Sequence, residues 1–181
     1  MILVSTSLLL LRFSVCEIPR ITSDSAGSDL HVLDRHGWQT VFKTMGSNTT
    51  LADYALRFSA SVAAPLFTPE DLYISQLTGI YEALSSGVTT VLDHAHHTWT
   101  PDHSAAGLNA SVDSGARVFF AYAFQNSSAQ FRIPEQIAQW RELSSTITQN
   151  NLTELAIAYD DFTNNPTGAD SLVVIDLIKY V

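Results

Sequence analysis

The chain alternates short apolar stretches rich in β-branched residues with segments that carry helical signals. The clearest helix start is Thr-Pro-Glu-Asp at 68–71, where a capping hydroxyl, a proline and two acids occur in the order that a helix N-terminus favours. Apolar residues then recur about every four positions until Gly87, and the apolar stretch 88–93 follows at once. Apolar strands that alternate with helices are typical of a parallel sheet covered by helices.

The same arrangement recurs along the chain, and the expected elements share either an apolar, β-branched or aromatic composition or a helical repeat. The expected strands are 30–37, 88–93, 116–124 and 154–162, and the expected helices are 50–65, 68–86, 102–115, 135–147 and 169–181. The last segment, rich in Val and Ile, is expected to be a helix, with a strand as the alternative. This pattern predicts an α/β fold with about four βα units.

Length and charge restrict what such a fold could do. A chain of 181 residues is long enough for one well-buried domain, expected over 30–181, after an atypical segment at 1–29. The net charge of −9 and the lack of a basic cluster argue against nucleic acid as a partner. The acidity is expected to serve solubility rather than chemistry.

The N-terminus leaves two compartments open. The apolar run 2–11 is too short for a membrane span, which needs about 20 residues, and it lacks the cationic start of a good signal peptide. Four glycosylation sequons, at Asn48, Asn109, Asn126 and Asn151, would suit secretion. These features leave a cytoplasmic and a secreted protein open, and we expect no membrane partner in either case.

Two polar clusters directly follow expected strands, where parallel sheets bind ligands. The denser one is Leu-Asp-His-Ala-His-His-Thr-Trp at 92–99. On an extended strand His94 and His96 face one side and His97 faces the other. This cluster could be a metal site, a substrate pocket, or the hydrogen-bonded polar end of a strand.

The other cluster, 33–40, places Asp34 and His36 two residues apart, so that both side chains point to the same face of the first strand. A pair of this kind at a strand end is a common way to hold a catalytic metal. The alternative is a salt-bridged aspartate beside a capped loop.

Three segments in the same order resemble the amidohydrolase superfamily, and within it the branch of chlorohydrolases and of guanine- and cytosine-type deaminases. They are DRHGWQT at 34–40, LTGIYEALSSGVTTVLDHAHHTW at 77–99 and SVDSGARVFFAY at 111–122. The resemblance covers about residues 33–160 and only the N-terminal half of the family's fold. It implies a partial (β/α)8 TIM-like barrel, a fold that needs about 250 residues when complete.

The resemblance also implies a divalent metal, zinc or iron, that acidifies a water for attack on an sp² carbon. His36 matches the second histidine of the family's His-x-His pair, and Asp34 stands where the first is usual. Gln39 and the histidines His94, His96 and His97 match positions that line the substrate pocket. The family's other ligands come from later strands, and no histidine follows His103, so the metal ligand set is expected to be incomplete.

The resemblance therefore implies a metal-dependent hydrolase of non-peptide C–N bonds, with a small-molecule substrate that is amide-like or heterocyclic. It implies a chain that is truncated and deficient in metal binding, and leaves open whether this chain alone is active. Because such enzymes are mostly intracellular, it also favours a cytoplasmic protein over a secreted one. No catalytic acid or base can be assigned. The alternative is a non-catalytic α/β fragment that associates with another chain. Half a barrel leaves two open sheet edges, which would also allow a homo-oligomer.

Overall fold

The fold was taken from a computed structural model, which describes residues 32–46, 48–147, 152–163, 165 and 167–180. Within the first strand, 32–35, only the backbone is described. The expected N-terminal segment 1–29 lies outside the described residues, so the predicted domain boundary stays a prediction.

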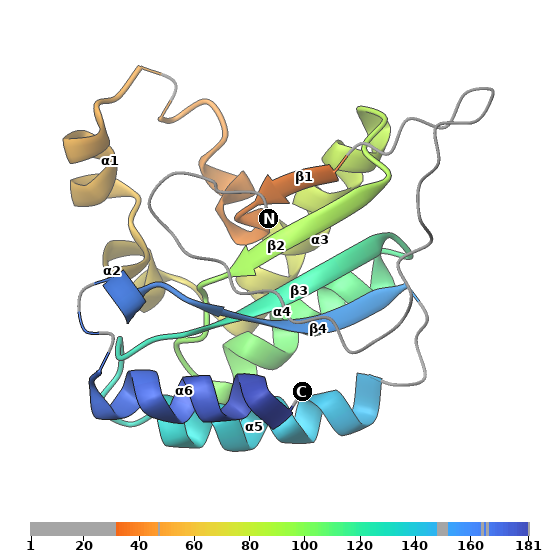
Figure 1. The fold of residues 1–181 in the computed structure, drawn as a ribbon. Helices are drawn as coiled ribbons and strands as arrows, with labels where there is room; N and C mark the ends of the chain where they lie inside the picture. The colour runs from red at the N-terminus through yellow and green to blue at the C-terminus, as the bar shows by residue number, and fades with distance from the viewer. Residues whose placement is uncertain (1–31, 47, 148–151, 164, 166, 181) are drawn as a thin grey trace.

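A four-stranded parallel sheet forms the centre of the fold (Figure 1). Its strands are β1 (Val32–Arg35), β2 (Thr90–Ala95), β3 (Arg117–Phe124) and β4 (Thr153–Tyr159), and they lie side by side in sequence order. Every neighbouring pair is parallel. The predicted α/β fold with about four βα units is confirmed.

Each strand leads to a helix that packs on the sheet: α3 (Pro69–Ser85), α4 (Pro101–Asp113), α5 (Ile133–Ile147) and α6 (Ala169–Tyr180). Figure 1 shows these helices gathered on one side of the sheet. The main apolar core lies between them and the strands, and includes Ile80, Phe120, Ile137 and Val174. The last element is a helix, as expected.

The helix ends follow the signals in the sequence. Thr68 accepts a hydrogen bond from the backbone of Asp71, whose carboxylate accepts one from the Thr68 N–H, so the two form a capping box. Gly87 and Gly115 follow α3 and α4 with φ of 87° and 66°. These angles lie in the left-handed region that glycine adopts at little cost, and they turn the chain into the next strand.

The connection between β1 and α3 differs from the prediction of one helix over 50–65. It contains a 3₁₀ helix η1 (Gly37–Phe42), then α1 (Leu51–Arg57), α2 (Ala60–Ala63) and a 3₁₀ turn η2 (Ala64–Leu66). The single helix was wrong because Ser59 adopts an extended conformation (ψ 159°), which breaks the helix after Arg57. In Figure 1, α1 lies at the edge of the molecule, away from the sheet.

The two faces of the sheet carry different residues. Val91 and Phe120 belong to the core under the helices, whereas Ala121, Ala123 and Ala158 form a separate cluster with Leu92. Because side chains alternate along a strand, this alanine-rich cluster lies on the face opposite the helices. Among the described residues, no helix is both long and apolar enough to cross a membrane.

Candidate functional site

Three histidines and an aspartate meet at the carboxyl ends of the strands. His36 follows β1, His94 is in β2, His96 follows β2 and Asp160 follows β4. The His36 ring centroid lies 4.2 Å from that of His96 and 5.2 Å from that of His94. We call these four residues the histidine cluster. It brings together His36, His94 and His96, of which strand alternation had placed only His94 and His96 on a common face.

A buried carboxylate behind the cluster fixes the loop that carries His36. Asp93 points toward the helices, where its Oδ1 accepts from the Gly37 backbone N–H at 3.1 Å and its Oδ2 accepts from Gln76 Nε2 at 2.7 Å. Asp93 and Gln76 are completely buried. This Asp93 anchor ties β2, α3 and the start of η1 together, and it therefore sets where His36 stands.

Within the cluster, His36 and His94 are held by hydrogen bonds with defined direction. The His94 carbonyl only accepts, so His36 donates to it through Nδ1–H at 3.1 Å, and neutral His36 then carries its lone pair on Nε2. His94 Nε2 lies 3.1 Å from Asp160 Oδ2. The hydrogen bond with His94 lowers the pKa of Asp160, so an ionised Asp160 accepts and Nε2 of His94 donates.

His96 is partly buried and packs edge-on against Trp38. The indole Nε1–H of Trp38 donates to His96 Nδ1 at 3.3 Å. Burial, and to a lesser degree the nearby His36 and His94 rings, lower the pKa of His96 to about 3, so His96 is neutral at physiological pH.

The structure does not bring His97 together with the other predicted substrate residues. Its ring packs against Phe120 at a centroid distance of 5.6 Å and against Gly107 of α4, on the helix side of the sheet. The ring is fully buried, and neither ring nitrogen has a hydrogen-bond partner among the described residues. His97 is part of the interface between β2 and α4.

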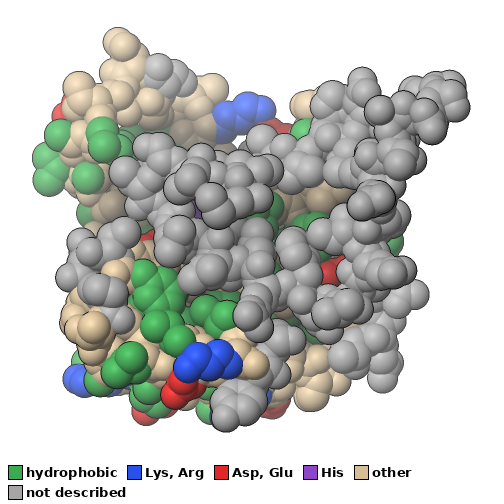
Figure 2. Space-filling view, in the orientation of Figure 1, with side chains coloured by type: hydrophobic (Ala, Val, Ile, Leu, Met, Phe, Trp, Pro, Cys, Tyr) green, Lys and Arg blue, Asp and Glu red, His purple; other side chains and the backbone are tan. Residues whose placement is uncertain are grey.

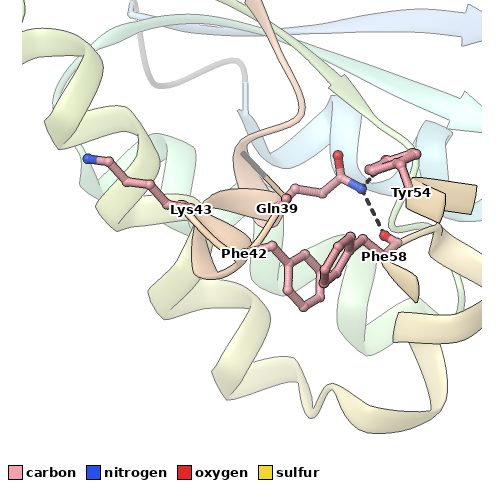
Figure 3. Close-up of a pocket in the computed structure, with 6 residues that line it drawn as sticks. Gln39, Phe42, Lys43, Tyr54 and Phe58 are labelled. Atoms are coloured by element: carbon pink, nitrogen blue, oxygen red, sulfur yellow. Dashed lines mark hydrogen bonds between the residues drawn. The ribbon is translucent and has the colours of Figure 1, made fainter. Parts of the chain in front are cut away.

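Gln39 also points away from the histidine cluster. Its side-chain amide donates to the Tyr54 hydroxyl and, at 3.2 Å, to the Phe58 carbonyl (Figure 3). These residues, with Phe42, Lys43 and Gly46, line a cavity of about 210 Å³ between η1 and α1. Figure 3 shows the Lys43 side chain directed away from it, and Lys43 pairs with Glu82 at 2.6 Å. The predicted contact of Gln39 with substrate stays a prediction.

Asp160 is the cluster member that the sequence did not reveal. It directly follows the strand β4, which is the position where polar residues of a parallel sheet face a ligand. The position after the strand was the signal for Asp160 in the sequence. Asp161 lies next to it, and nothing in the sequence distinguished the two aspartates. The pairing with His94 depends on the small side chains of β3, the strand between them.

The described side chains do not complete a metal site. No group of three or more His, Cys, Asp and Glu residues among them is arranged to hold a metal ion. Asp34 lies in β1 with its backbone opposite Leu92, and its side chain is outside the description. The expected pair of Asp34 and His36 therefore stays a prediction.

Comparison with known proteins identifies this architecture. No protein-family model and no curated protein matches the sequence. Among solved structures, the chain is similar to guanine deaminase from C. acetobutylicum with bound guanine, at 13% identity and a TM-score of 0.57 over 71% of this chain and 31% of that chain. It is also similar to an adenosine deaminase from Xanthomonas campestris with bound Zn, at 15% identity and a TM-score of 0.60 over 82% of this chain and 33% of that chain.

The chain shares its fold with a part of each of these two solved structures. Both neighbours are amidohydrolase-superfamily members, so the resemblance seen in the sequence is confirmed at the level of the fold. The predicted partial TIM-like barrel is confirmed as well. The chain spans about a third of the length of these neighbours, and identities this low carry no residue-level function.

Proposed function

We propose that this chain contributes to a deaminase-like hydrolase of non-peptide C–N bonds, with an amide-like or heterocyclic substrate bound at the histidine cluster. The observation that carries the proposal is the meeting of His36, His94 and His96 at the carboxyl ends of the strands in a deaminase-like fold. In (β/α) folds this edge of the sheet is where chemistry takes place.

The described residues support substrate binding more directly than a complete reaction. Neutral imidazoles offer hydrogen-bond donors and acceptors that recognise a polar heterocycle. The divalent metal implied by the resemblance, zinc or iron, would need ligands beyond the described set, with His36 and Asp34 as the first candidates. His36 is suited to this role, because donation from Nδ1 to a backbone carbonyl orients the ring in the way that metal-ligating histidines are commonly oriented.

The test combines metal content with turnover. Zinc and iron are measured in the purified full chain, and deamination is followed against a panel of purines, pyrimidines and triazines. Metal and turnover found together, and both lost in His36→Ala, would support the proposal. Lys179→Ala, an exposed change on α6, is the control and should behave like the wild type. If the wild-type chain contains no metal and shows no turnover, the proposal is refuted.

A second candidate is a fragment that acts by association with another copy. The observation that favours it is the arrangement of the sheet, since β1 and β4 each pair on one side only within the described residues. Apolar side chains are also exposed between β1 and α3, with Leu51 at 82%, Leu56 at 75% and Leu66 at 74% of their full exposure. In Figure 2 apolar side chains stand out around α1.

Light scattering coupled to size exclusion distinguishes this candidate. Association through these surfaces predicts a mass above 19.8 kDa that falls when Leu51 and Leu56 are both replaced by Lys. A monomer that unfolds cooperatively would rule it out.

A further inference from the structure

We propose that His96 presents its Nε2–H as a fixed hydrogen-bond donor to an acceptor atom of the ligand, and that Trp38 is the positioning residue that sets this tautomer. The inference rests on the proposed function, and it names the ligand class: a heterocycle whose edge offers a carbonyl oxygen or an unprotonated ring nitrogen.

The tautomer follows from the chemistry of Trp38. Its indole nitrogen can only donate, so His96 Nδ1, 3.3 Å away, must accept and carries no hydrogen, which places the ring hydrogen on Nε2. The indole cannot easily turn elsewhere, because it is fully buried and packed edge-on against Phe67 and Trp99 at centroid distances of 5.5 and 5.0 Å.

The backbone of His96 is fixed as firmly as its ring. Its N–H donates to the His94 carbonyl at 2.9 Å, and its own carbonyl accepts from Gln125 Nε2 at 2.8 Å. Gln125, at the end of β3, also donates to Thr98 Oγ1 at 2.8 Å. The histidine is thus held by its ring and by its main chain, which is the pre-organisation that a recognition group needs.

The fixed donor has a specific consequence for recognition. Among the described residues, none accepts from Nε2 of His96 at hydrogen-bond distance. A ligand atom that accepts at this position gains a hydrogen bond, whereas one that offers only N–H meets another donor. A ligand that covers this donor with an N–H of its own takes away its contact with water and offers no acceptor in return. That loss costs more than one hydrogen bond gains, so discrimination of about tenfold or more is expected.

The experiment reads the tautomer directly. Two-bond ¹H–¹⁵N spectra of the full chain, labelled with ¹⁵N-histidine, distinguish protonated from unprotonated ring nitrogens, and His96→Gln assigns the signal. We expect Nε2–H on His96 in the wild type. Trp38→Phe should move the ring hydrogen to Nδ1 or mix the two forms, and circular dichroism shows whether this variant is folded. Nδ1–H in the folded wild type, or an unchanged tautomer in folded Trp38→Phe, overturns the proposal.

A ligand titration completes the test. Pyrimidine, whose ring nitrogens only accept, should shift the Nε2–H signal of His96, whereas pyrrole, which only donates, should not. Pyrimidine binding should persist in His96→Gln, whose Nε2 amide keeps a donor near the same place, and should weaken about tenfold or more in His96→Leu. Equal responses to the two rings refute the donor role. These readouts need neither metal nor turnover, so they separate a failure here from a failure of the proposed function.

Discussion

Replacing the buried His97 should change how the stability of the protein depends on pH. Burial lowers the pKa of His97 to about 3 from the ordinary 6.5, with a smaller effect from the charges of His103 and His36. The folded state therefore keeps His97 neutral, whereas the unfolded chain binds a proton below about pH 6.5. The unfolded state holds more protons in this window, so stability rises with pH: it is complete above about pH 6.5 and is lost as the pH falls toward 3.

The magnitude follows from these two pKa values. Each pH unit in the window costs about 1.4 kcal/mol, so His97 alone should remove about 2 kcal/mol between about pH 8 and about pH 5. His97→Leu removes this dependence. It should also raise stability at neutral pH by about 1 kcal/mol or more, since His97 buries two ring nitrogens without a hydrogen-bond partner among the described residues.

Urea unfolding of both proteins at several pH values measures the effect. The control is Phe120→Leu, which changes the ring that packs against His97 without adding or removing a titrating group. It should lower stability by about the same amount at every pH. His96 titrates in the wild type and in both variants, so the difference between curves isolates His97. Parallel curves for the wild type and His97→Leu would refute the reasoning.

Three further substitutions test a buried hydrogen bond, a contact between β2 and α4, and a helix cap. Asp93→Ala should lower the free energy of unfolding by about 2–5 kcal/mol, because the buried donors of Gly37 and Gln76 lose their acceptor, and it should broaden the NMR signals of the His36 ring. Asp93→Asn should lower it by less, and equal losses in the two variants would contradict the hydrogen-bond argument. Gly107→Ala should lower the free energy of unfolding, measured by thermal denaturation, by about 1–3 kcal/mol, because the new methyl group meets the His97 ring. Asn109→Ala, an exposed change on the same helix, should leave it unchanged. Thr68→Ala should lower the free energy of unfolding by about 1 kcal/mol, because it removes the capping box of α3. A similar decrease in Thr78→Ala, an exposed change on the same helix, would show that the cap is not the cause.

The order of strands and helices could be predicted because each local signal agreed with the final fold. Thr68 and Gly87 mark the ends of α3 in the sequence as they do in the structure. The connection after β1 was less predictable. The apolar pattern over 50–65 fits one helix, but such a pattern is only a weak local preference, and the extended backbone of Ser59 divides the segment into α1 and α2.

The candidate site was also predictable from the sequence only in part. Strand alternation was enough to place His94 and His96 on one face and His97 on the other. The direction of Gln39 was not predictable, because its partners Tyr54 and Phe58 come from α1, whose position depends on tertiary contacts. The pairing of His94 with Asp160 depends on the spacing of β2 and β4 in space, which sequence distance does not give.

The neighbours Asp93 and His94 make the register of β2 unusually well determined. Asp93 lies on the helix side of the sheet, where it accepts a hydrogen bond from the Gly37 N–H. His94 lies on the opposite face and pairs with Asp160. A slip of one residue would exchange them, placing a carboxylate among the imidazoles and an imidazole in the position that must accept two hydrogen bonds. Misaligned strands would thus lose the anchor and the cluster together. The protein cannot acquire a folded but misassembled site by this route, so correct pairing of β2 and integrity of the site should be gained or lost as one event.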